Sequence, residues 1–271
     1  MADHKSPEKR RWRPSGRSKS LFADVHRILA QLREAQKIAF LLDCDGTLVP
    51  IKPHPSEVRV PPQVKEVLGQ LVANRRLFVA IVSGRRVRDL KALFDVKGLR
   101  YFGLHGAEWA RGSTRISPAT LAAIRAAKQA ARRTFQAWPG IWVEDKVFTF
   151  SIHYRQAKPA ARNAAFLVLV TLLARWGDAL HILSGNRVWE ILPGEVAGKS
   201  STVLRILNDL PPGTPAIYIG DDGTDELAFK VLKDQITVRV GEHRATHARY
   251  YVRTPSDVIR FLARLETELR T

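Results

Sequence analysis

Three short apolar runs, far apart in the chain, each end in a cluster of polar residues. The runs IAFLL, LFVAIV and AIYIG are followed by Asp43-Cys44-Asp45, by Ser83-Gly84-Arg85 and by Asp221-Asp222. Such runs are typical of buried strands in a parallel sheet. In open α/β sheets, ligands bind outside the carboxyl ends of the strands. We therefore expect the three clusters to meet at one site.

Segments of strand and helix character alternate along most of the chain, and a final helix is predicted from Pro255. The alternation is interrupted at residues 112–193, where an Ala-rich helix, half-exposed alternating strands and a hairpin near Ser184 follow one another. We predict an α/β fold with a parallel sheet and helices on both faces, formed by residues 21–111 and 194–271. Residues 112–193 are predicted to form an inserted α+β cap domain.

The chain is strongly basic, with a formal net charge of +18. Its first 20 residues hold seven Lys and Arg against two acids, and we predict that residues 1–20 form a basic, flexible arm. The remaining charge is predicted to form a solvated basic surface. Because the sequence has no zinc-finger, RRM or basic-zipper pattern, no specific nucleic-acid binding is expected.

The sequence also indicates where the protein acts. A single cysteine excludes an internal disulfide framework, and no run of 18 apolar residues is present. The N-terminal segment lacks the apolar block of a secretory signal. We therefore expect a cytoplasmic monomer without a membrane span that acts on a small molecule.

Asp43 and Asp45 lie two residues apart, directly after a predicted strand. In an extended chain this spacing places both carboxylates on the same face. Two carboxylates aimed at one point repel each other, so a cation is needed if both are to be ionised. Oxygen ligands favour Mg²⁺, and Asp221 can supply a ligand from another strand. The sequence therefore predicts a magnesium site formed by Asp43, Asp45 and Asp221.

The same clusters offer groups that can bind and transfer phosphate. Gly46-Thr47 allows a tight turn with inward N–H groups, Ser83 offers a hydroxyl, and Lys199 offers a positive charge at a predicted helix start. A carboxylate can attack phosphorus to give an acyl phosphate, while a second one protonates the leaving oxygen and then activates water. We assign these roles to Asp43 and Asp45, respectively, with Ser83 and Lys199 as their catalytic partners.

Four segments resemble, in this order, the motifs of the haloacid dehalogenase superfamily of phosphatases. They are DCDGTL at 43–48, SGR at 83–85, Lys199 and GDDGTDE at 220–226. Other segments are similar to the trehalose-6-phosphate phosphatases within it. They are GLHGAEW at 103–109, EDK at 144–146, HYR at 153–155 and WEILP at 189–193.

This resemblance implies a Rossmann-like core with a cap, and magnesium-dependent hydrolysis of trehalose 6-phosphate to trehalose and phosphate through an aspartyl phosphate on Asp43. It also implies that the backbone carbonyl of Asp45 binds the metal, and that Asp222 and Asp225 hold metal-bound waters or Lys199. The residues implied to face the sugar or to close the cap are Arg85, His105, Glu144, Lys146, His153, Arg155 and Glu190.

Two positions differ from the family pattern. Ser200 follows Lys199 where the family has Gly, and a first helical turn accommodates serine. The family has a lysine before its Val-x-Glu strand, whereas this chain has Gly185-Asn186-Arg187. We predict that Arg187 substitutes for that lysine in binding the substrate.

Two other functions stay open at the level of sequence. The four motifs do not distinguish sugars, so sucrose phosphate, glucosylglycerol phosphate or another glycosyl phosphate is an alternative substrate. The basic charge leaves a second alternative, a nucleic-acid-binding protein on the same fold.

Overall fold

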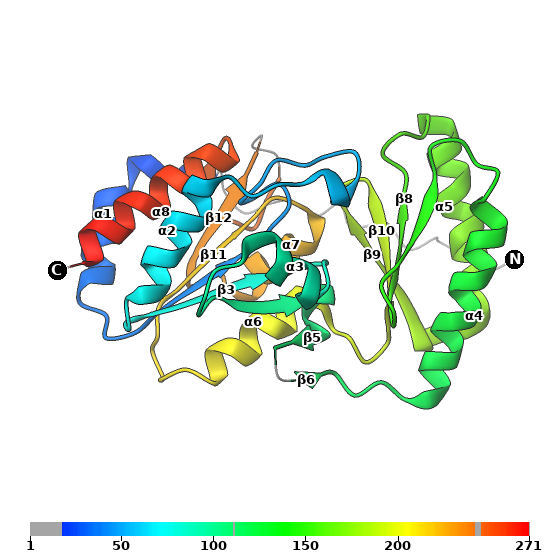
Figure 1. Cartoon of the computed structure of the whole chain (residues 1–271), viewed down its shortest axis with the longest axis horizontal. Coiled ribbons are helices and arrows are strands. Elements are labelled where there is room, and N and C mark those ends of the chain that lie inside the picture. The colour runs from blue at the N-terminus through cyan, green and yellow to red at the C-terminus, as the bar shows by residue number, and fades with distance from the viewer. Residues whose placement is uncertain (1–17, 111, 242–244, 271) are drawn as a thin grey trace, which may run out of the picture.

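The computed structural model describes residues 18–110, 112–241 and 245–270. Two groups of helices and strands follow each other along the long axis of the molecule (Figure 1). Within the described residues, the larger group contains a nine-stranded sheet and the smaller group a four-stranded sheet. Most of the predicted basic arm, residues 1–17, lies outside the described residues, whereas Lys19–Ser20 form the first strand.

The large sheet is parallel across most of its width. Its strands, in spatial order, are β1 (Lys19–Ser20), β13 (Tyr250–Val252), β12 (Ile236–Val240), β11 (Ala216–Gly220), β2 (Ile38–Leu42), β3 (Leu77–Val82), β4 (Arg100–Gly103), β5 (Glu108–Trp109) and β6 (Gly112–Ser113). The pairs β4–β5 and β5–β6 are antiparallel. Strand β2 is buried along its whole length in the centre of the sheet, which is why its sequence is continuously apolar.

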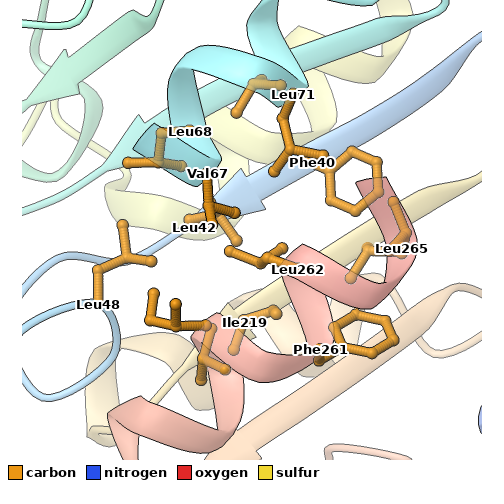
Figure 2. Packing of buried hydrophobic residues seen from close by; sticks show 14 of the residues in the cluster. Phe40, Leu42, Leu48, Val67, Leu68, Leu71, Ile219, Phe261, Leu262 and Leu265 are labelled. Atoms are coloured by element: carbon orange, nitrogen blue, oxygen red, sulfur yellow. The ribbon is translucent and has the colours of Figure 1, made fainter. Parts of the chain in front are cut away.

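Helices cover both faces of this sheet, which confirms the predicted α/β architecture. Phe40, Leu42 and Ile219 pack on one face against helices that include α2 and α8 (Figure 2), and Ala39, Leu41 and Tyr218 pack on the other. The first face carries α1 (Val25–Arg33), α2 (Pro62–Ala73), α3 (Val87–Phe94) and α8 (Pro255–Leu269). The second face carries α6 (Gly198–Asn208) and α7 (Gly223–Val231).

The four-stranded sheet is antiparallel and lies between the core and two helices (Figure 1). Its strands are β7 (Trp142–Asp145), β8 (Phe150–His153), β10 (Val188–Pro193) and β9 (Leu180–Gly185), and its helices are α4 (Pro118–Phe135) and α5 (Pro159–Leu173). Alternate residues such as Phe150 and Ile152 pack under the helices, so that Ser151 and His153 point to the other face. We call this group the cap. Gly112–Ser113, on the cap side of the predicted boundary, pair within the large sheet.

Four short 3₁₀ helices complete the described elements. They are η1 (Leu21–Ala23), η2 (Pro55–Glu57), η3 (Leu104–Gly106) and η4 (Ala174–Ala179). The sequence RYFGLHG at 100–106 predicts one more strand, but β4 ends at Gly103, because Leu104, His105 and Gly106 all have positive φ. A Cβ atom on Gly106 would lie 1.6 Å from Thr202 Oγ1, so only glycine lets α6 pack against this turn. No described helix is both long enough and apolar enough to cross a membrane.

Candidate active site

The polar clusters meet at the carboxyl edge of the large sheet. Asp43, Ser83 and Asp221 directly follow β2, β3 and β11, which are neighbours in the order β11-β2-β3. The chain stays tied to the sheet beyond the strand ends, because the Asp43 N–H donates to Ile219 O at 2.9 Å and the Ser83 N–H to Phe102 O at 2.9 Å. Three segments, each about 40 to 140 residues from the next in sequence, thus form one side of the candidate site. We call this side, which carries Asp43, Ser83 and Asp221, the core floor.

A lysine links this floor to a later helix. Lys199, in the first turn of α6, donates to Asp43 Oδ1 at 2.8 Å and to Asp225 Oδ1 at 2.8 Å. Asp225 also accepts the hydroxyl of Tyr218 at 2.6 Å and, through Oδ2, the N–H groups of Asp221 and Asp222. Burial alone would raise the pKa of Asp225, but Lys199 and these donors lower it. Asp225 is therefore a fixed anion that orients the lysine.

The carboxylates beside Lys199 are crowded. Burial, together with Asp225 and Asp222, raises the pKa of Asp43 to about 8 although Lys199 opposes the shift. Burial and the neighbouring Asp222 raise the pKa of Asp221 well above its usual value. Asp221 Oδ1 is buried and has no hydrogen-bond partner among the described residues. These groups therefore lack positive charge on the side of the floor away from Lys199.

The donor set fits a cation. Oxygen atoms of Asp43, Asp221 and Asp225 lie within 4.8 Å of one another. Both oxygens of Asp225 are already engaged by donors, whereas Asp43 has one oxygen on Lys199 and Asp221 keeps its buried Oδ1 without a partner among the described residues. Gly46 has φ +84°, and a Cβ atom on it would lie 2.2 Å from Asp221 Oδ2. The tight turn at Gly46 therefore places the loop that follows Asp43 in direct contact with the side chain of Asp221.

Asp45 is held by an arginine. Arg85 Nε and Nη2 donate to the two oxygens of Asp45 at 2.6 and 2.7 Å, and Arg85 also donates to Pro55 O at 3.2 Å. Burial would lower the pKa of Arg85, but Asp45 raises it. Ser83 accepts the Arg85 N–H at 3.3 Å. Ser83 and Arg85, the first and third residues of the SGR cluster, therefore position Asp45, in addition to lining the cavity.

Asp222 has a structural role that can coexist with metal binding. Its side chain caps α7 by accepting the N–H groups of Thr224 and Asp225. Its other oxygen accepts the N–H of Asn186, from the turn between β9 and β10, at 3.2 Å. Burial raises the pKa of Asp222. The acidic loop is therefore in direct contact with the cap.

The cap closes the other side with a buried ionic network. Lys146 donates to both oxygens of Glu190 at 3.1 and 3.2 Å and to Gly84 O, in the core, at 3.1 Å. Ser151 donates to Glu190 at 2.6 Å, and His105 Nε2 lies 3.8 Å from Glu190 Oε1. Burial would raise the pKa of Glu190, but Lys146 and His105 lower it strongly. Both ring nitrogens of His105 are buried without a hydrogen-bond partner within 3.5 Å among the described residues, and Nε2 faces Glu190.

Two further cap groups extend this wall. His153 and Glu144 are 2.8 Å apart, and the His153 ring stacks on Trp142 with centroids 4.0 Å apart. Burial would raise the pKa of Glu144, but His153 and Lys146 lower it. Arg155 donates to Asn186 O at 2.6 Å and so supports the β9–β10 turn.

One cavity of about 750 Å³ joins the floor to the cap wall. Its lining contains the predicted residues Asp43, Asp45, Ser83, Arg85, His105, Glu144, Lys146, His153, Arg155, Glu190, Lys199 and Asp222. Asp221 and Asp225 lie directly behind this lining.

Asn186 is among the residues that line the cavity and Arg187 is not, and the role of Arg187 in binding the substrate stays a prediction. Both residues are exposed in the turn between β9 and β10, where Arg187 has φ +60°. Asn186 Nδ2 lies 3.4 Å from Asp221 Oδ2. Sequence reasoning also missed Tyr218, because a tyrosine inside an apolar strand gives no sign that its hydroxyl reaches Asp225.

A strand-end aspartate paired with a lysine from a later helix, under a separately packed cap, places this chain among the haloacid dehalogenase-like phosphatases. A family model described as Trehalose-phosphatase matches residues 41–256, and the chain belongs to that family. The family resemblance noted in the sequence is thereby confirmed.

Individual relatives agree with this membership. A trehalose-phosphate phosphatase of Mycobacterium bovis is 34% identical over 250 residues, which cover 87% of this chain and 63% of that protein. A trehalose-6-phosphate phosphatase of Escherichia coli is 30% identical over 239 residues, which cover 86% of this chain and 88% of that protein. The chain thus spans less than two thirds of the mycobacterial relative.

A solved structure shows the same fold. The C-terminal domain of trehalose-6-phosphate phosphatase from C. albicans matches with a TM-score of 0.79 and 21% identity, and the match covers 93% of this chain and 99% of that one. The likeness therefore extends over both the core and the cap.

Proposed function

We propose that this chain hydrolyses trehalose 6-phosphate to trehalose and inorganic phosphate, with Asp43 as the nucleophile. The observation that carries the proposal is the buried Asp43–Lys199 pair, 2.8 Å apart, on the floor of a cavity whose other wall is the cap. Family membership supports the reaction, and the names of the relatives support the sugar.

We further propose Mg²⁺ as the cofactor, held by the carboxylates of Asp43 and Asp221 and by the backbone carbonyl of Asp45. The unpartnered Asp221 oxygen and the raised pKa of Asp43 support this assignment, because a cation favours the ionised form of both acids. When bound, Mg²⁺ neutralises charge on the phosphoryl oxygens and on the attacking carboxylate. Asp222 and Asp225 complete the site from behind, the latter by fixing Lys199.

In the first step, an Asp43 carboxylate oxygen attacks phosphorus and the bond from phosphorus to the sugar oxygen breaks. Asp45 gives its proton to the departing sugar oxygen, so that trehalose leaves as a neutral alcohol. Lys199 and Ser83 hold the phosphoryl oxygens in place. Because Arg85 occupies both oxygens of Asp45, it must release one of them before Asp45 can carry this proton.

In the second step, water attacks phosphorus of the acyl phosphate, and Asp45 takes up the proton that the water loses. The bond between phosphorus and the Asp43 oxygen breaks, which restores the Asp43 carboxylate and releases inorganic phosphate. Asp45 returns to the protonated state in which the cycle began.

The cap wall supports a sugar as the leaving group. His105, His153 and Lys146 offer donors, Glu144 and Glu190 offer acceptors, and their charges largely cancel. Such a wall suits a neutral polyhydroxyl compound, which needs many hydrogen bonds and no net counter-charge. Sucrose phosphate and glucosylglycerol phosphate satisfy the same description and stay as alternatives.

A panel of sugar phosphates tests the proposal. We expect phosphate release from trehalose 6-phosphate with a kcat/KM at least ~10-fold above those for sucrose 6-phosphate, glucosylglycerol phosphate and glucose 6-phosphate. Equal rates across the panel would overturn the assigned sugar and leave the phosphatase intact, and no release from any of them would overturn both. Rapid acid quenching followed by mass spectrometry should find one phosphoryl group on the peptide that contains Asp43.

A further inference from the structure

The catalytic cavity extends beyond the reaction floor and the cap wall into a third region, lined only by core residues. This region lies between the segment that joins β2 to α2 and one side of α3. Lys52, Arg59 and Lys65 contribute its positive charge, and Ile51, Val58 and Leu93 contribute apolar surface. We call this part of the cavity the basic annex.

The positive charge of the basic annex is poorly compensated. Among the described residues, neither Lys52 nor Lys65 has a hydrogen-bond or ion-pair partner, and Arg59 donates only to the carbonyls of Ser56 and Val58. Asp89, a carboxylate in the same wall, pairs with Arg86 at 2.8 Å. Lys52 and Arg59 are exposed, Lys65 is half-buried, and none of the three holds a carboxylate among the described residues, so a bound anion would be attracted by all three.

The basic annex is separated from the reaction floor by Arg85. That side chain donates to Asp45 on one side and to Pro55 O, in the annex segment, on the other. The same segment reaches the cap, since the His54 ring lies 5.4 Å from the Trp142 ring, and Figure 1 shows it arching toward the cap. A ligand in the annex would therefore contact the segment that joins β2 to α2. This segment accepts a hydrogen bond from Arg85, the partner of Asp45, and also contacts the cap through His54.

We propose that the basic annex is a second binding site, for a small organic anion that carries an apolar or aromatic body. The charge selects a carboxylate, sulfonate or phosphate, and Ile51, Val58 and Leu93 select the apolar body. Because Arg85 lies between the annex and the reaction floor, we expect the sugar phosphate at Asp43 and the ligand in the annex to bind at the same time. This site does not depend on which sugar phosphate the chain hydrolyses.

Naphthalene-1-sulfonate is a suitable probe, because it has one charge and an aromatic body and holds no phosphoryl group for Asp43 to accept. Calorimetric titration of the full chain should show one site, with weaker binding of 1-naphthol, which lacks the charge, and of methanesulfonate, which lacks the ring. Equal affinity for all three probes, or no binding of the sulfonate, would overturn the proposal.

Paired charge reversals localise the site. Lys52→Glu combined with Lys65→Glu should weaken binding of the probe by about tenfold or more. Lys97→Glu combined with Lys233→Glu makes the same change in net charge at exposed positions outside the cavity and should leave binding within about twofold. Equal weakening in both double variants would show diffuse attraction to a basic surface instead of a site. Alanine at positions 52 and 65 provides a milder pair, with a smaller loss in the same direction.

Kinetics separate the annex from the substrate cavity. The substrate for this test is the sugar phosphate of the panel that is hydrolysed fastest. At saturating naphthalene-1-sulfonate the protein should still release phosphate, and the apparent KM should reach a plateau as the probe concentration rises. Strictly competitive inhibition would mean that the annex is part of the substrate site, and the proposal would fail. The binding experiments stand without this measurement, so their outcome is independent of the proposed hydrolysis.

Discussion

The two walls of the catalytic cavity hold most of their buried acids in opposite states; the exception is Asp225 behind the core floor, whose pKa Lys199 lowers. On the core floor, burial and neighbouring acids raise the pKa values of Asp43, Asp221 and Asp222. On the cap wall, Lys146 and His105 overcome burial and lower the pKa of Glu190, and His153 and Lys146 lower that of Glu144. Burial is similar on both walls, so the difference comes from the number of cations within reach of each acid.

This contrast indicates a different task for each wall. The core floor has more carboxylate than positive charge, with Lys199 bonded to two acids, which suits the cation and the phosphoryl group that we propose it binds. On the cap wall each acid already has a cation beside it, and these groups can also donate or accept hydrogen bonds with uncharged hydroxyls. Chemistry is therefore expected on the core side and sugar recognition on the cap side.

Removal of the nucleophile should have the largest effect. Asp43→Asn keeps the shape of the floor and loses the attacking carboxylate, so kcat should fall by roughly 10⁴-fold or more. Phosphate release at saturating substrate measures it, and circular dichroism confirms the fold. Turnover above a tenth of the wild-type value would contradict the assigned mechanism.

Breaking the cap network should have the next largest effect. Glu190→Gln leaves Lys146 charged and buried beside a neutral amide, so we expect about 3 kcal/mol lower stability and a ~100-fold lower kcat/KM. Urea unfolding and steady-state kinetics measure the two changes. Lys128→Met is the matched control, because Lys128 also pairs with a cap acid, Asp145, at 2.6 Å but outside the cavity. The kcat/KM of Lys128→Met should stay within about twofold of the wild-type value. An equal loss in Lys128→Met and Glu190→Gln would show that the acids of the cap wall have no special role in activity.

The metal-free protein should become less stable as the pH rises from about 5 to about 8. Asp43 has a pKa of about 8 in the folded chain, far above that of an unfolded aspartate, so the folded state binds the extra proton across this range. Stability falls with rising pH wherever the folded state holds more protons. Added Mg²⁺ should accordingly raise the melting temperature more at pH 8 than at pH 6, where it must displace that proton.

Thermal unfolding with and without chelator, at several pH values, checks this dependence. The comparison with Asp43→Asn isolates the contribution of Asp43, because the variant keeps every other titrating group. A wild-type slope equal to that of the variant would show that Asp43 is already ionised without metal.

The smallest effect is expected at the contact between the two walls. Asn186→Ala removes a long hydrogen bond to Asp221 but keeps the backbone contact to Asp222, so kcat/KM should fall by about two- to fivefold. Arg187→Ala, at the neighbouring exposed position, should change it by less than about twofold. A larger loss in Arg187→Ala than in Asn186→Ala would support the substrate contact that the sequence predicts for Arg187.

Much of the core floor could be predicted because its residues are fixed by local rules. A strand buried on both faces must be apolar, so the change from apolar to acidic residues at Asp43 shows where the strand ends. Parallel strands bring their carboxyl ends to the same edge of the sheet. Lys199, 156 positions from Asp43, lies at the start of a helix, and the sequence placed it at this site through its positive charge and the family motifs, not through strand ends. The family motifs added the identity of the neighbours.

Other parts depended on contacts that no local pattern encodes. Whether Asn186 or Arg187 faces the cavity is decided by the turn that joins β9 and β10. The turn at Leu104–Gly106 was predicted as strand, because its positive φ angles are set by packing on Thr202 and not by the preferences of leucine or histidine.

The sequence by itself determined the α/β class, the cap between the second and third motifs, and an acidic floor with a lysine. These follow from periodicity and from residues whose chemistry has few alternatives. Tertiary structure alone decided which acids are short of positive charge and which are balanced, because a pKa depends on burial and on neighbours brought together from distant segments. It also placed Arg85 between Asp45 and Pro55, and so divided the cavity into a catalytic part and a basic annex.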